Sequence, residues 1–211
     1  MKEYKLPIGC DVPETIILAD GDFPSHPLAL EWLRQCPYVV CCDGAANTYI
    51  RSGRMSEAIV GDGDSLLPGI KERYASLIHS ETEQETNDLS KAFRFCLSQE
   101  RKRITIMGAT GKREDHTIGN VSLLADYMEQ AEVSMMTDYG IFVPIREDSM
   151  FESYIGQQIS VFNMNSTALS AEGLAYPLSV FTNWWQGTLN EALARHSIIR
   201  TEGKVLVFRV F

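Results

Sequence analysis

Short apolar runs that end in an acidic residue recur along the first part of the chain. The segments TIILAD (15–20), YVVCCD (38–43) and AIVGDGD (58–64) are of strand length and apolar throughout. Two further strands are expected, one within RITIMGAT (103–110), where it runs into a glycine loop, and one over residues 133–136. Continuous apolar character, without alternation, is typical of strands buried on both faces of a parallel sheet.

Segments with helical spacing of apolar residues alternate with these strands. HPLALEWLRQ (26–35) carries Pro27, which suits a first helical turn. Helices are also expected from about Asn87 and over residues 117–130. Their apolar stripes consist of Leu89, Ala92, Phe93 and Cys96 in the first and Ile118, Val121, Ala125 and Met128 in the second. The alternation predicts an α/β fold with a mostly parallel, Rossmann-like sheet flanked by helices.

The pattern changes after about residue 145, where helical spacing fades and short strands with turn residues follow. QQISVFNM, LSVFT and HSIIRTEGKVLVFRVF read as strands, and Thr201–Lys204 reads as a hairpin turn. We therefore expect two domains, an α/β domain over 1–145 and a small all-β domain over 146–211.

Composition narrows the classes of function. The 211 residues carry a formal net charge of -9 and no basic run, which argues against binding to nucleic acid or to a membrane surface. The five cysteines, Cys10, Cys36, Cys41, Cys42 and Cys96, mostly lie in apolar segments and contain no C-x-x-C pair. Together with an N-terminus that lacks an apolar leader, they favour a soluble protein in the reducing cytoplasm.

Acidic residues follow three of the expected strands, at the edge where parallel sheets bind ligands. Asp20 and Asp43 each close a strand, and Asp62 and Asp64 follow a third. Residues two apart in an extended chain point to the same side, about 6–7 Å apart, so these two carboxylates could hold Mg²⁺. An ordinary acidic turn explains the pair equally well when it is taken alone.

The segment QETNDLSKAF (84–93) opens a helix with Asn87 as its cap. Asp88 then complements the helix dipole and pairs with Lys91 three residues on. The alternative is that Asp88 is a third metal ligand and that Lys91 contacts phosphate. The local sequence does not decide between the two.

The segment GATGKREDHTIGN (108–120) joins a strand to a helix through Gly108 and Gly111. Backbone N–H groups at such a helix start suit a phosphate, and Lys112 and Arg113 add positive charge. The spacing excludes a Walker A loop. His116 is a candidate for catalysis or phosphate binding, although capping is the commoner role for such a residue.

The segment FTNWWQGTLNEAL (181–193) places Trp184 and Trp185 beside small polar residues. Adjacent residues of a strand point to opposite faces, so one indole could line a pocket for a flat ring. Plain packing is the simpler interpretation of the pair.

Taken in order, these motifs resemble those of the thiamine pyrophosphokinase family. CDGAAN (42–47) resembles its D-G-x-x-N segment and GDGDS (61–65) its G-D-x-D-S segment. QETNDLSK (84–91) and GATGKREDHTIGN (108–120) are similar to two further elements, and GLAYPL and GTLNEAL resemble landmarks near the C-terminus. Two departures are Asn87, where the family often has Thr, and Leu189, where Ser is usual.

The resemblance implies a C-terminal β-sandwich and a homodimer that binds thiamine between its subunits. It implies transfer of a pyrophosphoryl group from ATP to the thiamine hydroxyl, with AMP as the second product. The residues that it would assign are Asp62, Asp64 and Asp88 to Mg²⁺; Lys91, Gly108, Gly111, Arg113 and His116 to the polyphosphate; Asp115 to catalysis; and Asp43, Asn47, Gln84, Trp185, Thr188 and Asn190 to the substrates. The general base is not identified.

Three other functions fit parts of the same pattern. A haloacid dehalogenase-like phosphatase also has D-x-D after a strand, although usually after the first one. A pyrophosphokinase for a pterin-type alcohol would need similar acids. A thiamine or nucleotide sensor could keep the fold without turnover, but it would have no need for the acids.

Overall fold

The structure is a computed structural model that describes residues 1–8, 12–81, 83 and 85–211. Its contacts divide the chain into two compact units. One contains Val12–Leu123 and Glu129–Asp138, and we call it the α/β unit. The other contains the N-terminal segment, Leu124–Met128 and Tyr139–Phe211, and we call it the β unit.

The α/β unit is built on parallel strands in the order β7-β6-β2-β3-β4-β5. Their bounds are β2 (Thr15–Leu18), β3 (Val39–Cys42), β4 (Ala58–Gly61), β5 (Ile78–Ser80), β6 (Arg103–Met107) and β7 (Glu132–Met136). Every residue of β2, β3 and β4 is buried, which explains why their sequences are apolar throughout. The strands expected from the sequence for this unit are confirmed. The strand expected at LSVFT (178–182) is wrong, because these residues lie within the described part of the chain and form no strand.

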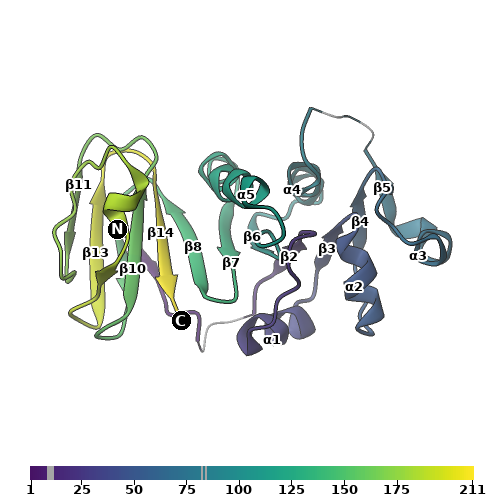
Figure 1. Cartoon of the computed structure of the whole chain (residues 1–211), viewed down its shortest axis with the longest axis horizontal. Coiled ribbons are helices and arrows are strands. Elements are labelled where there is room, and N and C mark those ends of the chain that lie inside the picture. Colours follow the sequence, from purple (N-terminus) through teal and green to yellow (C-terminus); the bar gives the residue numbers. More distant parts are fainter. Residues whose placement is uncertain (9–11, 82, 84) are drawn as a thin grey trace. The chain divides into compact units, whose positions relative to one another are not determined.

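Helices cover both faces of this sheet. They are α1 (Pro27–Gln35), α2 (Ala45–Arg51) and α4 (Asp88–Ser98). The other helical elements are α3 (Pro68–Arg73), which buries none of its residues, α5 (Glu114–Tyr127), whose last turn belongs to the β unit, and a short 3-10 turn, η1 (Ala75–Leu77). Figure 1 shows α1 and α2 on one face of the strands and α4 on the other. The α/β character predicted from the alternating pattern is therefore confirmed for this unit.

The starts of helices α1 and α4 agree with those expected from the sequence. The His26 side chain accepts a hydrogen bond from Leu28 N at the start of α1, where Pro27 occupies the first turn. Asn87 caps α4 by accepting a hydrogen bond from Ser90 N, and the expected apolar face of α4 is buried. The stripe expected for α5 is wrong in part, because Ile118 is 58% exposed and the buried side chains are Leu124 and Tyr127.

The β unit contains two layers of strands. One sheet has the order β1-β9-β13-β11, and the other layer has β12, β10, β14 and β8 in that order. Their bounds are β1 (Lys2–Tyr4), β8 (Gly140–Ile145), β9 (Ser149–Glu152), β10 (Gln158–Asn163), β11 (Leu169–Glu172), β12 (Asn190–Glu191), β13 (His196–Thr201) and β14 (Val205–Val210), with a 3-10 turn, η2 (Trp184–Gly187). The pairings are antiparallel except between β1 and β9, so the sheets of the chain are mixed.

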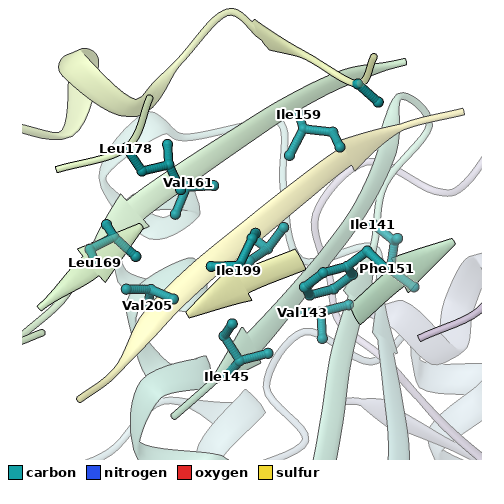
Figure 2. Packing of buried hydrophobic residues seen from close by; sticks show 12 residues of the cluster. Ile141, Val143, Ile145, Phe151, Ile159, Val161, Leu169, Leu178, Ile199 and Val205 are labelled. Carbon is teal, nitrogen blue, oxygen red and sulfur yellow. The ribbon is translucent and has the colours of Figure 1, made fainter. Parts of the chain in front are cut away.

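Alternate residues of these strands form one apolar core. Ile141, Val143 and Ile145 of β8 point into the same cluster as Phe151 of β9 and Ile199 of β13 (Figure 2). Because every second residue of a strand points inward, one face of each strand is buried. This explains why the apolar residues of the C-terminal sequence do not follow helical spacing. Both layers contribute to the core, as in a β-sandwich.

The N-terminal strand joins the β unit through a buried arginine. β1 pairs with β9 in parallel, and Tyr4 stacks on Phe151 with ring centroids 4.8 Å apart. Arg209 is 2% exposed and donates hydrogen bonds to the backbone oxygens of Lys5 and Glu152. The prediction placed residues 1–145 in one domain, whereas β1 and β8 belong to the β unit.

The hairpin predicted at Thr201–Lys204 is wrong. β13 pairs with β9 and β11, whereas β14 pairs with β8 and β10, so this turn carries the chain from one layer to the other. Gly203 makes the change of direction possible with φ +120°. None of the helices in the described parts of the chain has the length and apolar character needed to span a bilayer.

Four of the cysteines lie within the described residues, and all four are free thiols. Burial raises the pKa of Cys41 and of Cys96 to about 12, which keeps these thiols protonated and unreactive. Cys10 lies outside the described residues.

Candidate functional site

The loops that follow four neighbouring strands meet at the carboxyl edge of the α/β unit. Asp20 follows β2, Asp43 follows β3, Asp62 follows β4 and Gly108 follows β6. These strands are adjacent and parallel, so their loops share one edge of the sheet. The convergence expected from the sequence is present, and this edge is the candidate functional site.

The loops after β2 and β6 lie directly against each other. Gly21 N donates to Gly108 O at 2.6 Å, and Asp22 N donates to Thr110 O at 2.9 Å. A Cβ at Gly21 would lie 2.3 Å from Thr110 O, so only glycine allows this approach. Gly108 itself has φ +64°. The two loops therefore form one fixed piece of backbone beside the acids.

Asp43 is the most buried acid at this edge, with 3% of its surface exposed. Its Oδ2 accepts a hydrogen bond from Ser65 N at 3.0 Å, while its Oδ1 is buried without a partner among the described residues. Burial raises the pKa of the carboxyl, and the negative charges of Asp88 and Asp62 raise it further. Its backbone φ of +28° is unusual for a residue other than glycine.

Asn47 holds the loop that carries the paired acids. Its Nδ2 donates to Ser65 O at 2.8 Å, and its Oδ1 accepts from Leu67 N at 2.9 Å. Both ends of the amide are thus used to position the segment after β4. A role of Asn47 in substrate binding stays a prediction, and the contacts observed serve the loop.

Asp62 and Asp64 extend from that loop toward solvent. The Oδ1 of Asp62 accepts a hydrogen bond from Asp64 N at 3.1 Å, and Lys71 Nζ donates to the Gly63 oxygen between them at 3.0 Å. Asp64 and Lys71 also line a hollow of about 450 Å³ beside the loop. Lys71 thus holds the backbone between the two acids.

Asp88 and Lys91 form an ion pair at the start of α4. The Lys91 Nζ lies 3.2 Å from Asp88 Oδ1, and the side chains are 4% and 38% exposed respectively. The i,i+3 pairing is as expected, but the near-complete burial of the ammonium is not evident from the sequence. A buried ammonium at this edge of the sheet can bind an anionic ligand that displaces water from the site.

The acids at this edge are separate in the structure. Among residues 1–8, 12–81, 83 and 85–211, no group of three or more His, Cys, Asp or Glu side chains is gathered into a metal site. The donor chemistry nevertheless fits a hard cation, because the buried Oδ1 of Asp43 has no partner among the described residues and the negative charges of Asp88 and Asp62 act on the same carboxyl. The assignment of Asp62, Asp64 and Asp88 to Mg²⁺ therefore stays a prediction.

The phosphate-loop candidates lie at the start of α5, and their side chains are exposed. Arg113 Nη2 and Nε contact the two carboxylate oxygens of Asp115 at 2.5 and 3.0 Å, and Asp115 also accepts from His116 N at 2.9 Å. The hydrogen bond from Arg113 lowers the pKa of Asp115 to about 2. Gly111 has φ +77°, and Lys112 contacts Asp20 across the edge.

The expected thiamine-binding residues lie in the β unit. Trp185 is 73% exposed, and Thr188 Oγ1 donates to Trp185 O at 2.7 Å. The two tryptophans lie on η2 and not on a strand, so the argument from opposite strand faces is wrong. Trp184 packs edge-on against Phe162, with centroids 6.0 Å apart.

Asn190 is buried, and its amide is used by the fold. Its Nδ2 donates to Tyr176 O at 2.8 Å, and its Oδ1 accepts from Tyr176 N and Glu191 N. These contacts tie β12 to the segment before it, so the substrate role expected for Asn190 stays a prediction beside a clear structural one. Gln84 lies outside the described residues.

Three residues at this edge have contacts that the motifs did not indicate. Asp20 and Lys112 form an ion pair, and Lys71 contacts the acid loop from eight residues away. The sequence did contain a signal for Asp20, which is the acid that closes the first strand, and for Lys112, which is the cation in the glycine loop. No local pattern marks Lys71.

A parallel α/β sheet with acids and glycine loops at its carboxyl edge, together with a β unit, defines a class of proteins suited to nucleotides or other phosphate ligands. Two family models match this chain, "Thiamin pyrophosphokinase, catalytic domain" over residues 29–136 and "Thiamin pyrophosphokinase, substrate-binding domain" over residues 140–208. The chain therefore belongs to the thiamin pyrophosphokinase family.

Curated relatives carry the same family name. Thiamin pyrophosphokinase 1 of Caenorhabditis elegans is 26% identical over 190 residues, which cover 82% of this chain and 74% of that protein. Thiamine pyrophosphokinase 1 of rice is 29% identical over 129 residues, and this match spans 49% of each protein. The chain thus spans about half the length of the rice relative.

Solved structures of family members share the fold. The thiamin pyrophosphokinase of Candida albicans superposes with a TM-score of 0.80 at 17% identity, covering 100% of this chain and 93% of that one. The Bacillus subtilis enzyme gives 0.78 at 20% identity, covering 93% and 98%. At these identities the likeness establishes the fold.

Proposed function

We propose that the protein transfers a pyrophosphoryl group from ATP to the hydroxyl of thiamine. The observation that carries this proposal is the match of both family models, in order, to the two units described above. The acidic carboxyl edge of the α/β unit supports it, because this edge offers the donor chemistry that a nucleotide triphosphate needs.

In the proposed reaction, the thiamine hydroxyl oxygen forms a bond to the β-phosphorus of ATP. The bond from that phosphorus to the bridging oxygen on the α-phosphorus breaks, AMP leaves, and the hydroxyl proton passes to an acceptor that remains unassigned. Such transfers depend mainly on positioning and on stabilising negative charge. Thiamine diphosphate and AMP are the products.

In the proposed reaction, some residues would stabilise negative charge on the phosphates and others would orient the reacting groups. Arg113 and Lys91 would bind phosphate oxygens, and the backbone at Gly108 and Gly111 and the His116 side chain would complete the phosphate site. Asp115 would orient Arg113, which it already holds through both carboxylate oxygens. The family resemblance would assign Gln84 and Asp43 to orientation of the substrate.

Mg²⁺ would offset the charge of the transferred group when it is bound. Asp62, Asp64 and Asp88 are the side chains that would hold it, with Asp43 behind them. Lys71 Nζ contacts the backbone oxygen of Gly63, which lies between Asp62 and Asp64 in the loop. The loop is thus fixed in place by Lys71 and Asn47 before any cation binds.

The experiment that tests this function is AMP release from Mg·ATP with and without thiamine, with thiamine diphosphate identified by mass spectrometry. Asp62→Asn should lower turnover by orders of magnitude and leave the urea midpoint unchanged. Glu57→Gln is the matched control, because Glu57 directly precedes β4 whereas Asp62 directly follows it. It should turn over like wild type.

Other outcomes would identify the rival functions. Free phosphate without AMP indicates a phosphatase, and AMP release with a pterin alcohol but not with thiamine indicates a different acceptor. Thiamine or nucleotide binding without AMP indicates a sensor. Wild-type turnover in Asp62→Asn would remove the acid loop from the mechanism.

The thiamine end of the site is proposed to lie at a homodimer interface. Trp185, Leu189 and Leu193 are 73%, 76% and 55% exposed, and such apolar area favours contact with a ring or with a second subunit. Thr188 would contribute its hydroxyl near the ring. Leu189 stands where family members usually carry Ser, and its φ of +63° is unusual for a branched residue.

Subunit mixing tests this shared site. Asp62→Asn and Trp185→Ala carry lesions in different units, and Trp185 is exposed enough that its loss should not unfold the protein. With random pairing half of the dimers are mixed, and one of their two sites is intact, so activity should approach roughly a quarter of wild type. If mixing gives only the average of the two parents, each site is built within one chain.

The proposed compartment is the cytoplasm. Free, buried thiols at Cys41, Cys42 and Cys96 fit a reducing environment. Fractionation of cells that express a tagged full chain would test this assignment.

A further inference from the structure

Lys112 lies across the gap between two loops of the candidate site. Its Nζ donates to the backbone oxygen of Asp20 at 2.8 Å and to Asp20 Oδ1 at 3.1 Å. The two side chains are 54% and 47% exposed. The ammonium therefore lies at the carboxyl ends of β6 and β2 and remains open to a ligand.

The backbone that carries Lys112 is unusual. Its φ of +55° is left-handed, a region that residues with a Cβ enter rarely. The preceding loop is fixed by the Gly21–Gly108 and Asp22–Thr110 hydrogen bonds. Strained conformations that the surroundings hold in place concentrate at ligand sites.

The carboxylate of Asp20 is confined as well. Its Oδ1 contacts Lys112, and a Cβ at Gly44 would lie 2.7 Å from its Oδ2. Asp20 thus lies between the glycine loop after β6 and the start of α2. It neutralises a cation at the edge where the motifs place the polyphosphate.

A second ion pair joins the same two strands at their other ends. Arg103 Nη1 contacts Glu14 Oε1 at 2.7 Å, with side chains 64% and 55% exposed. This pair matches the Lys112–Asp20 pair in exposure and in the strands that it links. It lies away from the ligand edge and provides an internal control.

We propose that Lys112 is a polyphosphate-binding residue and that Asp20 holds its ammonium in place until phosphate displaces the carboxylate. The inference rests on the proposed function, in that the ligand is the polyphosphate of the nucleotide. A polyphosphate carries several negative charges and the Asp20 side chain carries one, so the exchange favours the ligand. The contact to the Asp20 backbone oxygen keeps the ammonium at the edge during the exchange.

Calorimetric titration with tripolyphosphate and with Mg·ATP, without thiamine, tests the exchange. Lys112→Gly should bind both ligands about tenfold more weakly, which corresponds to about 1.4 kcal/mol. Glycine adopts the same φ without strain, so the variant should melt at or above the wild-type temperature.

Asp20→Asn should bind tripolyphosphate about threefold or more tightly, because a competing negative charge is removed. This gain should disappear in the Asp20→Asn, Lys112→Gly double variant, since the two residues act on the ligand as a pair. Arg103→Met and Glu14→Gln should bind like wild type. A merely structural ion pair would change the melting temperature and leave the affinities unchanged.

Two results would overturn the proposal. One is wild-type affinity in Lys112→Gly, and the other is a gain from Asp20→Asn that persists in the double variant. Failure of the proposed function has a separate signature, in which tripolyphosphate binds and responds to Lys112→Gly but thiamine yields no AMP. A wild-type protein that binds no polyphosphate would overturn both.

Discussion

Lys91 and Asp88 should respond to substitution with opposite changes in stability, although both substitutions should abolish turnover. The Lys91 ammonium is almost fully buried, whereas the Asp88 carboxylate, 3.2 Å away, is 38% exposed. At an effective dielectric constant of about 20, their attraction is about 5 kcal/mol. Burial of an ammonium costs several kcal/mol, so the pair contributes little net stability.

Lys91→Met removes the buried charge and fills most of the same volume with apolar atoms. The Asp88 carboxylate regains water, and burial of the methionine side chain adds about 1–2 kcal/mol. We therefore expect the variant to be as stable as wild type or more stable, by up to about 2 kcal/mol. A gain in stability with loss of function is typical of a residue retained for binding.

Asp88→Asn leaves the ammonium buried without its partner charge and weakens the start of α4. We expect a loss of about 1–3 kcal/mol, below the cost of breaking a fully buried pair because the carboxylate is partly in water. Hydrogen exchange of α4 amides and urea unfolding, both without ligands, would measure the two changes. These readouts do not require both units to unfold together.

Glu31→Gln is the control, because it breaks an i,i+3 pair with Arg34 on α1 that is exposed on both sides. Its urea midpoint should match wild type. If Lys91→Met loses as much stability as Asp88→Asn, the buried pair is structural and the proposed role of Lys91 in phosphate binding loses this support.

Three further substitutions test the loops and the N-terminal strand. Asp138→Asn should lose about 1–2 kcal/mol at neutral pH; burial raises the pKa of Asp138, but hydrogen bonds from Ser25 and His26 outweigh it and leave it below the usual 3.8. The stability that the Asp138 carboxylate contributes is present above its usual pKa and is lost as pH falls through the lowered pKa. The difference in urea midpoint between wild type and Asp138→Asn should therefore shrink below about pH 4. A difference that stays constant with pH would contradict the assignment. Arg209→Met should cost about 2–3 kcal/mol and expose the β1 amides to hydrogen exchange; unchanged protection there would contradict its role as an anchor. Gly108→Ala should cost about 1–3 kcal/mol and impair nucleotide binding, because its φ is +64° and a backbone oxygen would lie 2.7 Å from the new Cβ; wild-type affinity would show that the loop adapts.

The local pattern was sufficient for features that depend on a few neighbouring residues. The apolar runs identified β2, β3 and β4, and Asn87 marked the start of α4. Because parallel strands share one carboxyl edge, the acids after them could be placed together without any knowledge of the tertiary structure.

Strand pairings between residues that are far apart in the chain could not be predicted from the local sequence pattern. β1 is three residues long and pairs with β9, in the register Lys2↔Ser149, so only the assembled sheet reveals it. The turn at Gly203 looks like a hairpin locally, yet β13 and β14 choose partners in different layers. Such choices depend on which faces become buried.

The same limit applies to polar side chains. Asn47 and Asn190 resemble substrate ligands in the sequence, whereas their observed hydrogen bonds hold the segments after β4 and before β12. The burial of Lys91 likewise follows from packing of α4 against the sheet. Amide and ammonium groups do not reveal in the sequence whether the backbone or a ligand will be their partner.

The distribution of unfavourable features within one sheet argues for the site independently of any motif. Asp43 combines a buried, unpartnered oxygen with a positive φ, Lys112 is held in a left-handed conformation, and Lys91 buries an ammonium. All three lie at the carboxyl edge, whereas the amino ends of β2 and β6 carry an ordinary exposed pair, Arg103 and Glu14. Burial of each charge and the left-handed φ of Lys112 cost stability. The two buried charges are opposite in sign, so a bound cation would offset the carboxylate of Asp43 and a bound anion would offset the ammonium of Lys91. A fold selected for stability alone would not concentrate such costs on one side of its sheet.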